Sequence, residues 1–395
     1  MTSTSKKLAQ YAAWPTLTDR DVYRVLSDQL TSMFPDMPAG YKCDAETVSD
    51  LVVKASVEGT TLEGTCADLT AAPTGETVRA YLNDALAVTE LTEAQCAVNQ
   101  RLQDRLPRRL WRAPLELAID LHDEPFYGKD PLLQAYACRG EAQAGTTWFY
   151  RVATVYVLHH GVPCTLGVVF VLPEHTPQML VQSLLALVKR LKIRVAGLYL
   201  DKGFCGRAVI EYLEAAGYPA IIACPIRGKQ GGTRALCHGR KSYWTTHTFA
   251  AGTANAYSAR LAIVRTYATD HGQRRATWCV YVVIHLKVSD PSIMRARYRA
   301  RFGVEGSYRA MRQTHAKTTS RNPAVRFFLL GVAFLILNLW VIVRWHFCQV
   351  PRRGGRTVNQ KAYELQRHQQ FLRRAIERRY DSVSTIQAQV APLQL

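Results

Sequence analysis

Paired cysteine motifs and clustered cysteine and histidine residues are absent from the 395-residue sequence. Its ten cysteines are scattered singly, and its eleven histidines supply only one adjacent pair, His159 and His160, beside a glycine. Zinc sites need ligands at short, repeated spacings, so no zinc centre is expected. The cysteines are predicted to be reduced thiols, mostly buried, as is usual in the cytosol.

A secretory leader is also lacking. Lys6 and Lys7 are followed neither by an apolar segment nor by a small-residue cleavage site, so the expected compartment is the cytoplasm. Hydrophobic residues make up 48% of the chain and aromatic residues 10%, which excludes a largely disordered or collagen-like protein. The length is sufficient for two or three domains.

Acidic residues are scarce over most of the chain. The sequence holds 50 Lys and Arg against 31 Asp and Glu, a net charge of +19. Residues 1–105 carry 9 basic and 15 acidic side chains, a balance of −6, whereas the remainder carries 41 and 16, a balance of +25. A polyanion, either nucleic acid or anionic lipid, is therefore the expected partner of the C-terminal three quarters.

Long apolar runs are missing, with one exception. Residues 327–343 are uncharged over 17 positions, between Arg326 and Arg344. That length is the lower limit for a membrane-spanning helix. Asn338 interrupts the run and no second such segment exists, so a buried core helix is the favoured interpretation and a membrane span the alternative.

Residues 1–108 are expected to form a helical region. Thr60 and Glu63 fit a capping box, and Thr74 is the predicted N-cap of an amphipathic helix over residues 75–88. Two short helices across a tight turn have helix-turn-helix spacing, although the net negative charge leaves a docking bundle equally open. The first alternative places four residues near DNA: Glu76, Thr77, Arg79 and Tyr81.

From residue 114 the pattern changes to alternating strands and helices. Strand, hairpin, helix, strand, helix and strand follow one another, which predicts an α/β fold with a ribonuclease-H-like mixed sheet flanked by helices. This core is assigned to residues 109–345. Its predicted strands are residues 115–121, 148–159, 162–172, 195–200 and 220–224, and its helices are residues 176–192 and 207–216.

Residues 227–290 break this rhythm. Several glycines come first, and strand-like stretches follow over residues 261–267 and 277–287. The segment is too long for a simple loop, so a β-rich insertion is predicted before the helix that begins at Pro291. Trp244 and Trp278 are expected to be core residues of this insertion, and stacking on an extruded DNA base is the alternative.

Two basic segments flank the apolar run. Pro291 opens a predicted arginine-rich helix that continues to Gln313. Residues 346–395 form a basic C-terminal tail, and its helix over residues 361–380 shows no continuous apolar stripe. The tail is expected to contact DNA or a partner subunit.

Carboxylates stand where buried strands of the predicted sheet emerge. Asp120 closes the first apolar strand, and Asp201 follows the fourth. Ligands of open α/β sheets bind at the carboxyl ends of strands, and a buried carboxylate is costly unless a metal or donor compensates it. Glu305 is a third candidate on the arginine-rich helix, where a surface salt bridge is the plainer alternative. Asp123 and Glu124 are expected in a turn, so Asp120 is preferred.

Four features in order resemble those of a known family. Tyr298, Arg301, Glu305 and Arg312 match a Tyr-x2-Arg-x3-Glu-x6-Lys signature, with arginine in place of lysine. The residues around Asp120 and Asp201, and Asn338-Leu339-Trp340 in the apolar run, are also similar. Over about residues 110–345 the chain resembles bacterial insertion-sequence transposases, which carry a DDE triad on a ribonuclease-H-like core.

The resemblance implies a function and partners. Asp120, Asp201 and Glu305 would be the catalytic residues and the ligands of two Mg²⁺ ions, for which Mn²⁺ can substitute. The implied activity is DNA cleavage at the ends of an insertion sequence, followed by strand transfer of the freed 3′-hydroxyl into target DNA. The implied partners are the terminal inverted repeats, target DNA and a second copy of the chain, with no membrane, in the nucleoid-associated cytoplasm.

Cations around the three acids are expected to hold DNA phosphates. The signature residues would share one face of a single helix with Glu305, and the other cations lie in loops beyond strand ends. The alternative is that these arginines are solvent-exposed residues of a surface helix without a binding role. Two alternative functions also remain: a stand-alone metal-dependent nuclease without joining activity, and an inactive DNA-binding derivative. The predicted DNA contacts are Tyr298, Arg301, Arg312, Lys129, Lys202, Arg207 and Arg79.

Overall fold

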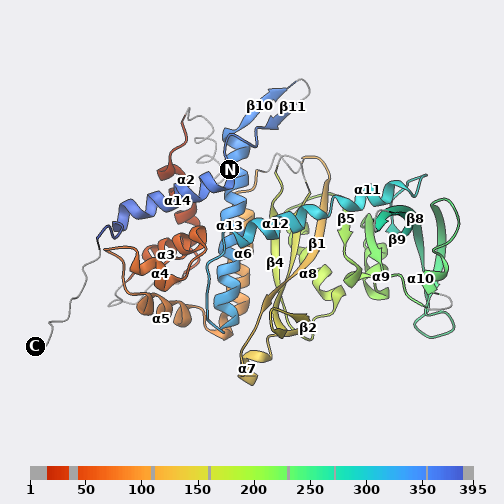
Figure 1. Ribbon diagram of the computed structural model, residues 1–395, viewed down its shortest axis with the longest axis horizontal. Helices are drawn as coiled ribbons and strands as arrows, with labels where there is room; N and C mark the ends of the chain where they lie inside the picture. The colour runs from red at the N-terminus through yellow and green to blue at the C-terminus, as the bar shows by residue number, and fades with distance from the viewer. Residues whose placement is uncertain are drawn as a thin grey trace, which may run out of the picture. The chain divides into compact units, whose positions relative to one another are not determined.

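The computed structural model describes residues 16–34, 43–107, 112–158, 162–228, 232–270, 273–352 and 355–385 (Figure 1). The chain divides into two compact units. The helical unit combines residues 1–101 with residues 310–395, and the sheet unit comprises residues 102–309. The boundaries fall within two helices, α6 (Leu91–Asp104) and α12 (Phe302–Arg312).

The sheet unit is built on a mixed sheet that has nine strands within the described residues. The path runs β2-β3-β1-β5-β6-β9-β8-β7, and β4 also pairs with β3. β1 is antiparallel to β3 and parallel to β5, and β6 is parallel to β5. The order β4-β3-β1-β5-β6 is that of a ribonuclease-H-like core, so the predicted fold class is confirmed. The strands are β1 (Leu115–Pro125), β2 (Cys138–Gln143), β3 (Thr146–Val157), β4 (Thr165–Val171), β5 (Val195–Leu200), β6 (Ala220–Cys224), β7 (Tyr243–Phe249), β8 (Tyr257–Asp270) and β9 (Gln273–Ile284).

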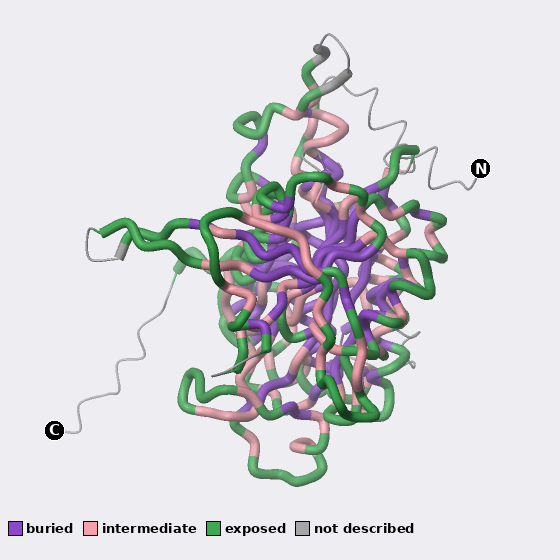
Figure 2. Tube along the Cα trace, turned by 90° about the vertical axis from the view of Figure 1, so that its right-hand side faces the viewer, coloured by how far each residue is buried: buried purple, intermediate pink, exposed green. Residues whose placement is uncertain are grey.

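Apolar composition explains the central strands. All residues of β4 are buried, and β-branched valines dominate it, as suits a strand covered on both faces. Figure 2 shows buried stretches running through the interior and exposed segments along the loops. Helices connect the strands: α8 (Pro177–Arg190) has Thr176 as its N-cap, whose hydroxyl accepts from the Met179 amide at 3.2 Å. The other helices of this unit are α7 (Pro131–Gln134), α9 (Arg207–Ala215), α10 (Gly232–Ala235) and α11 (Ile293–Arg299).

β1 is longer than predicted. It continues to Pro125 because β3 pairs with it along this length, up to Pro125 opposite Phe149. Asp120 therefore lies inside the strand and does not close it. Asp123 and Glu124 also belong to the strand, so their assignment to a turn is wrong. The predicted His-Gly hairpin turn between β3 and β4 lies outside the described residues.

The strands of residues 227–290 continue the main sheet. β9 pairs antiparallel with β6, and β8 and β7 follow in order. The Trp244 indole donates to the carbonyl oxygen of Ser289 at 2.8 Å, and the Arg260 guanidinium lies 3.9 Å from its ring centroid. Trp244 also packs against a buried core cluster, in agreement with a structural role. Trp278 is half-buried on β9.

The single helix predicted over residues 291–313 is wrong. α11 ends at Arg299 and α12 begins at Phe302. Between them the amides of Ala300 and Arg301 donate to carbonyl oxygens three residues earlier, each at 3.0 Å. This tight turn breaks the α-helical pattern. Side chains on either side of this turn contact different strands of the sheet.

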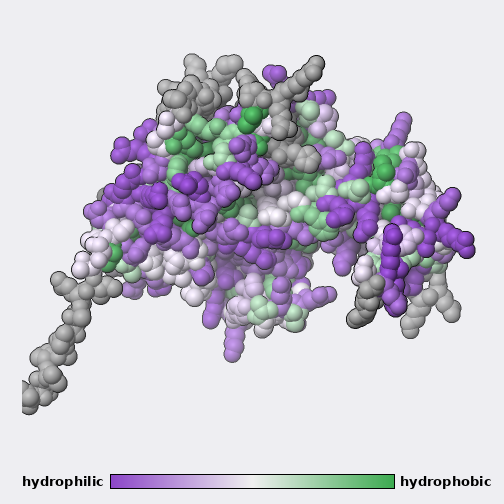
Figure 3. All heavy atoms as spheres, turned by 45° about the horizontal axis from the view of Figure 1, so that its top comes forward, coloured by the Kyte–Doolittle hydropathy of each residue, from purple (hydrophilic) through white to green (hydrophobic). Residues whose placement is uncertain are grey.

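The apolar run lies in α13 (Pro323–Phe347) of the helical unit. Its most apolar 18-residue stretch is long enough to cross a membrane, but 89% of that stretch is buried inside the protein, which confirms the predicted core helix. A β-carbon on Gly331 would meet a methyl of Val98 at 2.6 Å, so α13 packs closely on α6. The face of the molecule drawn in Figure 3 is mainly hydrophilic.

The acidic N-terminal helices and the basic C-terminal helix share one unit. α14 (Leu365–Tyr380) packs against α2 and α3, and its Arg378 and Arg379 pair with acids of those segments, Asp19 and Glu46. The opposite charges of the two ends of the sequence therefore partly neutralise each other. The remaining elements are α2 (Asp19–Thr31), α3 (Ala45–Glu58), α4 (Leu62–Ala67), α5 (Gly75–Ala85), η1 (Val88–Glu90), β10 (Gln349–Arg352) and β11 (Gly355–Val358).

Two local predictions in this unit are corrected. The N-cap of α4 is Thr61 and not Thr60, because the Gly64 amide donates to the Thr61 hydroxyl at 3.1 Å. α14 has an apolar stripe after all, which the sequence conceals because a histidine and a tyrosine take part in it. The Thr74 N-cap is confirmed, although α5 ends at Ala85. The buried residues of the stripe are His368, Leu372, Ile376 and Tyr380.

Candidate active site

One arginine of the sheet unit joins all three predicted catalytic acids. The guanidinium of Arg301 lies 2.8 Å from Asp120 Oδ2, 3.1 Å from Glu305 Oε1 and 3.9 Å from Asp201 Oδ1. The acids come from β1, from the end of β5 and from α12, across 185 positions of sequence. The fold therefore brings the three carboxylates to a common centre.

Asp120 is the most deeply placed of the three. It lies in the middle of β1 with 14% of its side chain exposed, and its Oδ1 accepts from the Leu121 amide at 3.0 Å. Burial raises the pKa of Asp120 to about 6, although Arg301 and the amide favour its charged form. An added cation beside this carboxylate would favour its ionised form.

Asp201 is positioned by a tyrosine of α11. It follows β5 directly and precedes the short turn η3 (Lys202–Phe204). The Tyr298 hydroxyl donates to the Leu200 carbonyl oxygen at 3.2 Å and lies 3.4 Å from Asp201 Oδ1. Burial raises the pKa of this phenol far above its ordinary value, so Tyr298 is a donor. α11 is thereby fastened to the end of β5.

Glu305 lies in the first turn of α12, and Tyr308 fixes that helix. Tyr308 is buried, and its hydroxyl lies 2.6 Å from the hydroxyl of Thr154. Thr154 stands opposite Asp120 in the β1–β3 register. The His122 ring packs on Tyr308 with centroids 5.0 Å apart. The sequence analysis missed these residues, although a tyrosine three positions after Glu305 falls on the same helix face.

The charges of this cluster do not balance. Three carboxylates face one guanidinium, which leaves two negative charges uncompensated when all are ionised. Burial disfavours the charge on Arg301, but Asp120 and its neighbours hold the guanidinium pKa above its ordinary value. Carboxylate oxygens at a partly exposed, electronegative centre are the donor set that suits Mg²⁺ or Mn²⁺. The residues therefore fit a divalent-cation site.

Asp123, the rejected neighbour of Asp120, has a structural role. Its two carboxylate oxygens accept from Arg151 of β3 at 2.6 and 2.8 Å. Such a bidentate pair is geometrically specific and occupies both oxygens. It fastens β1 to β3 beyond Asp120.

The other predicted DNA contacts are spread along the chain. Lys202 follows Asp201 directly, and Lys129 lies in the loop after β1; both are exposed. Arg207 at the start of α9 pairs with Glu211 at 2.6 Å and donates to the Ala254 carbonyl oxygen. Arg312 is the exposed last residue of α12, two helical turns beyond Glu305.

Arg79 belongs to the helical unit and makes a local pair. Its guanidinium lies 2.6 Å from Glu63 Oε1, which links α5 to α4. Tyr81, placed near DNA by the helix-turn-helix interpretation, is only 4% exposed. That residue is a core residue, so its assignment to a DNA surface is wrong.

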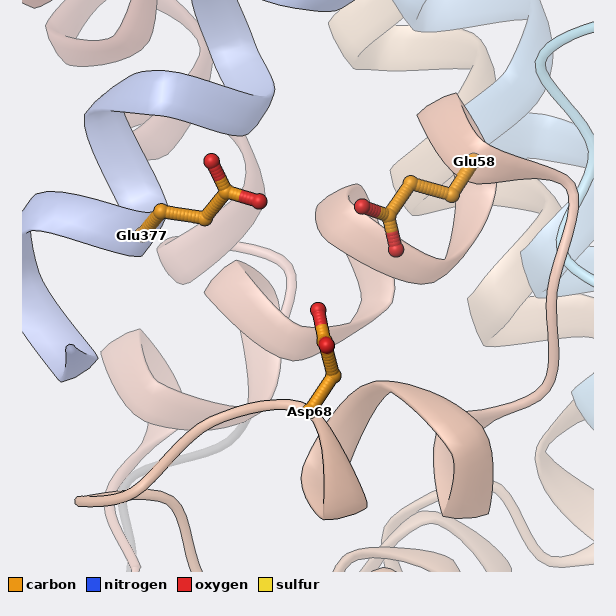
Figure 4. Close-up of side chains that lie close together, drawn as sticks. All are labelled: Glu58, Asp68 and Glu377. Carbon is orange, nitrogen blue, oxygen red and sulfur yellow. The ribbon is translucent and has the colours of Figure 1, made fainter. Parts of the chain in front are cut away.

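A second cluster of three acids lies in the helical unit. Figure 4 shows Glu58 of α3, Asp68 after α4 and Glu377 of α14 facing a common centre. Among the described residues, this is the group of three acids whose oxygens come within 4.8 Å of one another. The ammonium of Lys54 lies 2.7, 2.7 and 3.7 Å from them, and Arg373 pairs with Glu58 and Glu377. Two cations already form ion pairs with these acids, so the cluster is an ion-pair network.

A ribonuclease-H-like sheet with three convergent carboxylates defines a class of proteins suited to phosphodiester chemistry. A family model described as the transposase DDE domain matches residues 122–339, more than half of the chain. The chain belongs to this family of transposases, which act on DNA and use divalent metal ions. The matched segment contains Asp201 and Glu305 and begins two residues after Asp120.

A solved structure supports the fold. The chain is similar to the cryo-EM structure of a piggyBac transposase synaptic complex with hairpin DNA, with a TM-score of 0.55 and 11% sequence identity. The similarity covers 92% of this chain and 79% of that chain. At this identity the likeness concerns the fold alone. No curated protein matches the chain in sequence.

Proposed function

We propose that this transposase cleaves DNA at the ends of a bacterial insertion sequence and joins the freed ends to target DNA. The observation that carries the proposal is the convergence of Asp120, Asp201 and Glu305 on one cation from three separate elements. The match of Tyr298, Arg301, Glu305 and Arg312 to the transposase signature agrees with it.

Asp120, Asp201 and Glu305 would hold two Mg²⁺ ions, for which Mn²⁺ can substitute. When bound, such ions activate an attacking oxygen and stabilise the leaving oxygen in an in-line displacement at phosphorus. The chain fixes the carboxylates through the strand register of β1 and through the hydroxyls of Tyr298 and Tyr308. Water attacks in the cleavage step, and the freed 3′-hydroxyl attacks in the joining step.

Cations beside the acids hold the DNA. Arg301 and Tyr298 would position the phosphate next to the scissile bond, since a guanidinium binds phosphate oxygens in pairs. A second contact zone would lie along the loops and helix ends of Lys129, Lys202, Arg207 and Arg312. Arg79 and the basic C-terminal segment would contribute to end recognition or to subunit contacts. Synapsis of two ends requires a homodimer or larger assembly, which would act in the nucleoid-associated cytoplasm.

The test is incubation of the purified chain with a labelled terminal-repeat duplex and a plasmid target, with and without Mg²⁺. We expect joined product that requires Mg²⁺ and disappears with Asp120→Asn. Glu124→Gln is the matched control, because Glu124 lies on the same face of β1 four residues further. Cleavage without joining would instead identify a stand-alone nuclease. DNA binding without any cleavage would identify an inactive derivative.

A further inference from the structure

We infer that Arg301 is a displaceable counter-ion: without DNA its guanidinium occupies the cation site between the three acids, and a DNA phosphate draws it away. Loading of divalent ions is then coupled to DNA binding. This inference rests on the proposed function, and it concerns the order in which ions and DNA enter the same site.

Arg301 and a metal ion would compete for the same oxygens. Its two terminal nitrogens contact Asp120 Oδ2 and Glu305 Oε1 at hydrogen-bond distance and face Asp201 Oδ1. Both competitors are cations, so they repel each other at this range. The Arg301 side chain is only 8% exposed, which places the guanidinium between the acids and not at the rim of the site.

The bonding of Arg301 is incomplete in this position. Its Nε–H is buried and has no hydrogen-bond partner, although a buried donor without a partner is costly. The rings of Tyr298 and Phe302 lie 5.5 and 5.6 Å from the guanidinium carbon. A phosphate presents several oxygens and can accept from Nε and a terminal nitrogen together. The unpartnered donor therefore favours a second partner of phosphate type.

The backbone at Arg301 is suited to such an exchange. The residue lies in the break between α11 and α12, where the helical pattern gives way to a tight turn. Tyr298 and Tyr308 fasten the helices on either side to β5 and β3. The side chain can thus change partners while the carboxylates stay in place.

Competition between Arg301 and the metal ions links ion binding to DNA binding. If DNA removes the competing guanidinium, it tightens divalent-ion binding, and the ions tighten DNA binding by the same factor. The free protein would hold its ions weakly, which would limit cleavage away from the correct DNA end.

The experiment measures Mn²⁺ binding to the full chain without DNA, from the electron paramagnetic resonance signal of free Mn²⁺. We expect Arg301→Gln to bind Mn²⁺ about tenfold more tightly than the wild type, because three carboxylates lose their internal counter-ion. Arg301→Lys, which keeps the charge but not the forked geometry, should fall between the two. Arg299→Gln, at an exposed arginine two residues earlier, should bind like the wild type.

A second titration adds a terminal-repeat duplex that lacks the 3′-hydroxyl. The duplex should tighten Mn²⁺ binding in the wild type by about tenfold and in Arg301→Gln by less than threefold, after subtraction of the signal from an Asp120→Asn/Asp201→Asn protein. Equal or weaker Mn²⁺ binding by Arg301→Gln, or equal tightening by DNA in both proteins, would overturn the inference while leaving the proposed function intact. Mn²⁺ binding that does not depend on Asp120 in any variant would overturn both.

Discussion

Two clusters in this chain each gather three carboxylates around one cation, and they differ in how well the charge is matched. In the helical unit, Lys54 is fully buried and Arg373 adds a second positive charge, so one negative charge remains. In the sheet unit, Arg301 alone faces three acids, so two negative charges remain.

In charge balance, the Lys54 cluster is an ion-pair network and the Arg301 cluster is the one proposed for the chemistry. The acids around Lys54 lie closest together, yet the ammonium group of Lys54, which has three N–H donors, already forms ion pairs with them. The acids around Arg301 lie further apart and retain the charge that an added divalent cation would neutralise. Proximity of carboxylates alone therefore selects the cluster around Lys54, whereas uncompensated charge selects the cluster around Arg301.

The largest expected effect tests this comparison through the acids themselves. Asp201→Asn should lower DNA cleavage on the order of a thousandfold, because a carboxylate that holds the ions is lost. Asp68→Asn, the matched change in the helical unit, should leave cleavage within about twofold. Both rates are measured on the same labelled duplex in Mg²⁺. Comparable losses in the two variants would mean that the Lys54 cluster also serves the chemistry.

Much of the sheet could be predicted because its strands are strongly apolar. β5 and β6 match their predicted bounds, and α8 begins one residue after its predicted start. The extension of β1 through Asp123 and Glu124 could not be predicted from apolar composition, since those residues are polar. They belong to the strand because they pair with β3. The break before Phe302 was missed because Ala300 and Arg301, the residues between the two helices, are good helix formers.

The acids of the site were identified from their order and their resemblance to a family signature, and their roles remain predictions. Sequence placed Asp201 at a strand end, where the structure has it. It could not show that Arg301 contacts all three acids, because Asp120 and Arg301 are 181 positions apart. Nor could it show that Tyr308 fastens α12 opposite Asp120, since that depends on strand register.

The second prediction removes the cation of the structural cluster. Lys54→Met should destabilise the helical unit by about 3 kcal/mol, because Glu58, Asp68 and Glu377 would be left facing one another with Arg373 alone. Urea unfolding followed by circular dichroism measures the change. Lys189→Met, at an exposed lysine of α8, should cost less than about 0.5 kcal/mol. A loss below about 1 kcal/mol at Lys54 would show that the cluster contributes little to stability.

The smallest expected effect concerns pH, at another buried acid of the helical unit. Asp50 is 1% exposed and accepts hydrogen bonds from the hydroxyls of Tyr23 at 2.8 Å and Tyr380 at 3.0 Å. Burial raises the pKa of Asp50 to about 6, although the two hydroxyls and Arg379 favour its charged form. In the unfolded chain the pKa of an aspartate is about 4. Protonation is therefore more favourable in the folded state.

This pKa difference determines how the stability of the folded chain changes with pH. The contribution of Asp50 to stability is fully present below about pH 4 and is lost as the pH rises through about 6, with a total of roughly 3 kcal/mol. Asp50→Asn cannot titrate, so its stability relative to the wild type should improve by about 2 kcal/mol between pH 4 and pH 6.5 in urea unfolding. DNA cleavage at pH 7.5 should stay within about twofold, because the residue serves the helical unit. Parallel stability curves for the two proteins would show that Asp50 keeps an ordinary pKa. A large loss of cleavage would show that Asp50 also matters for the chemistry of the sheet unit.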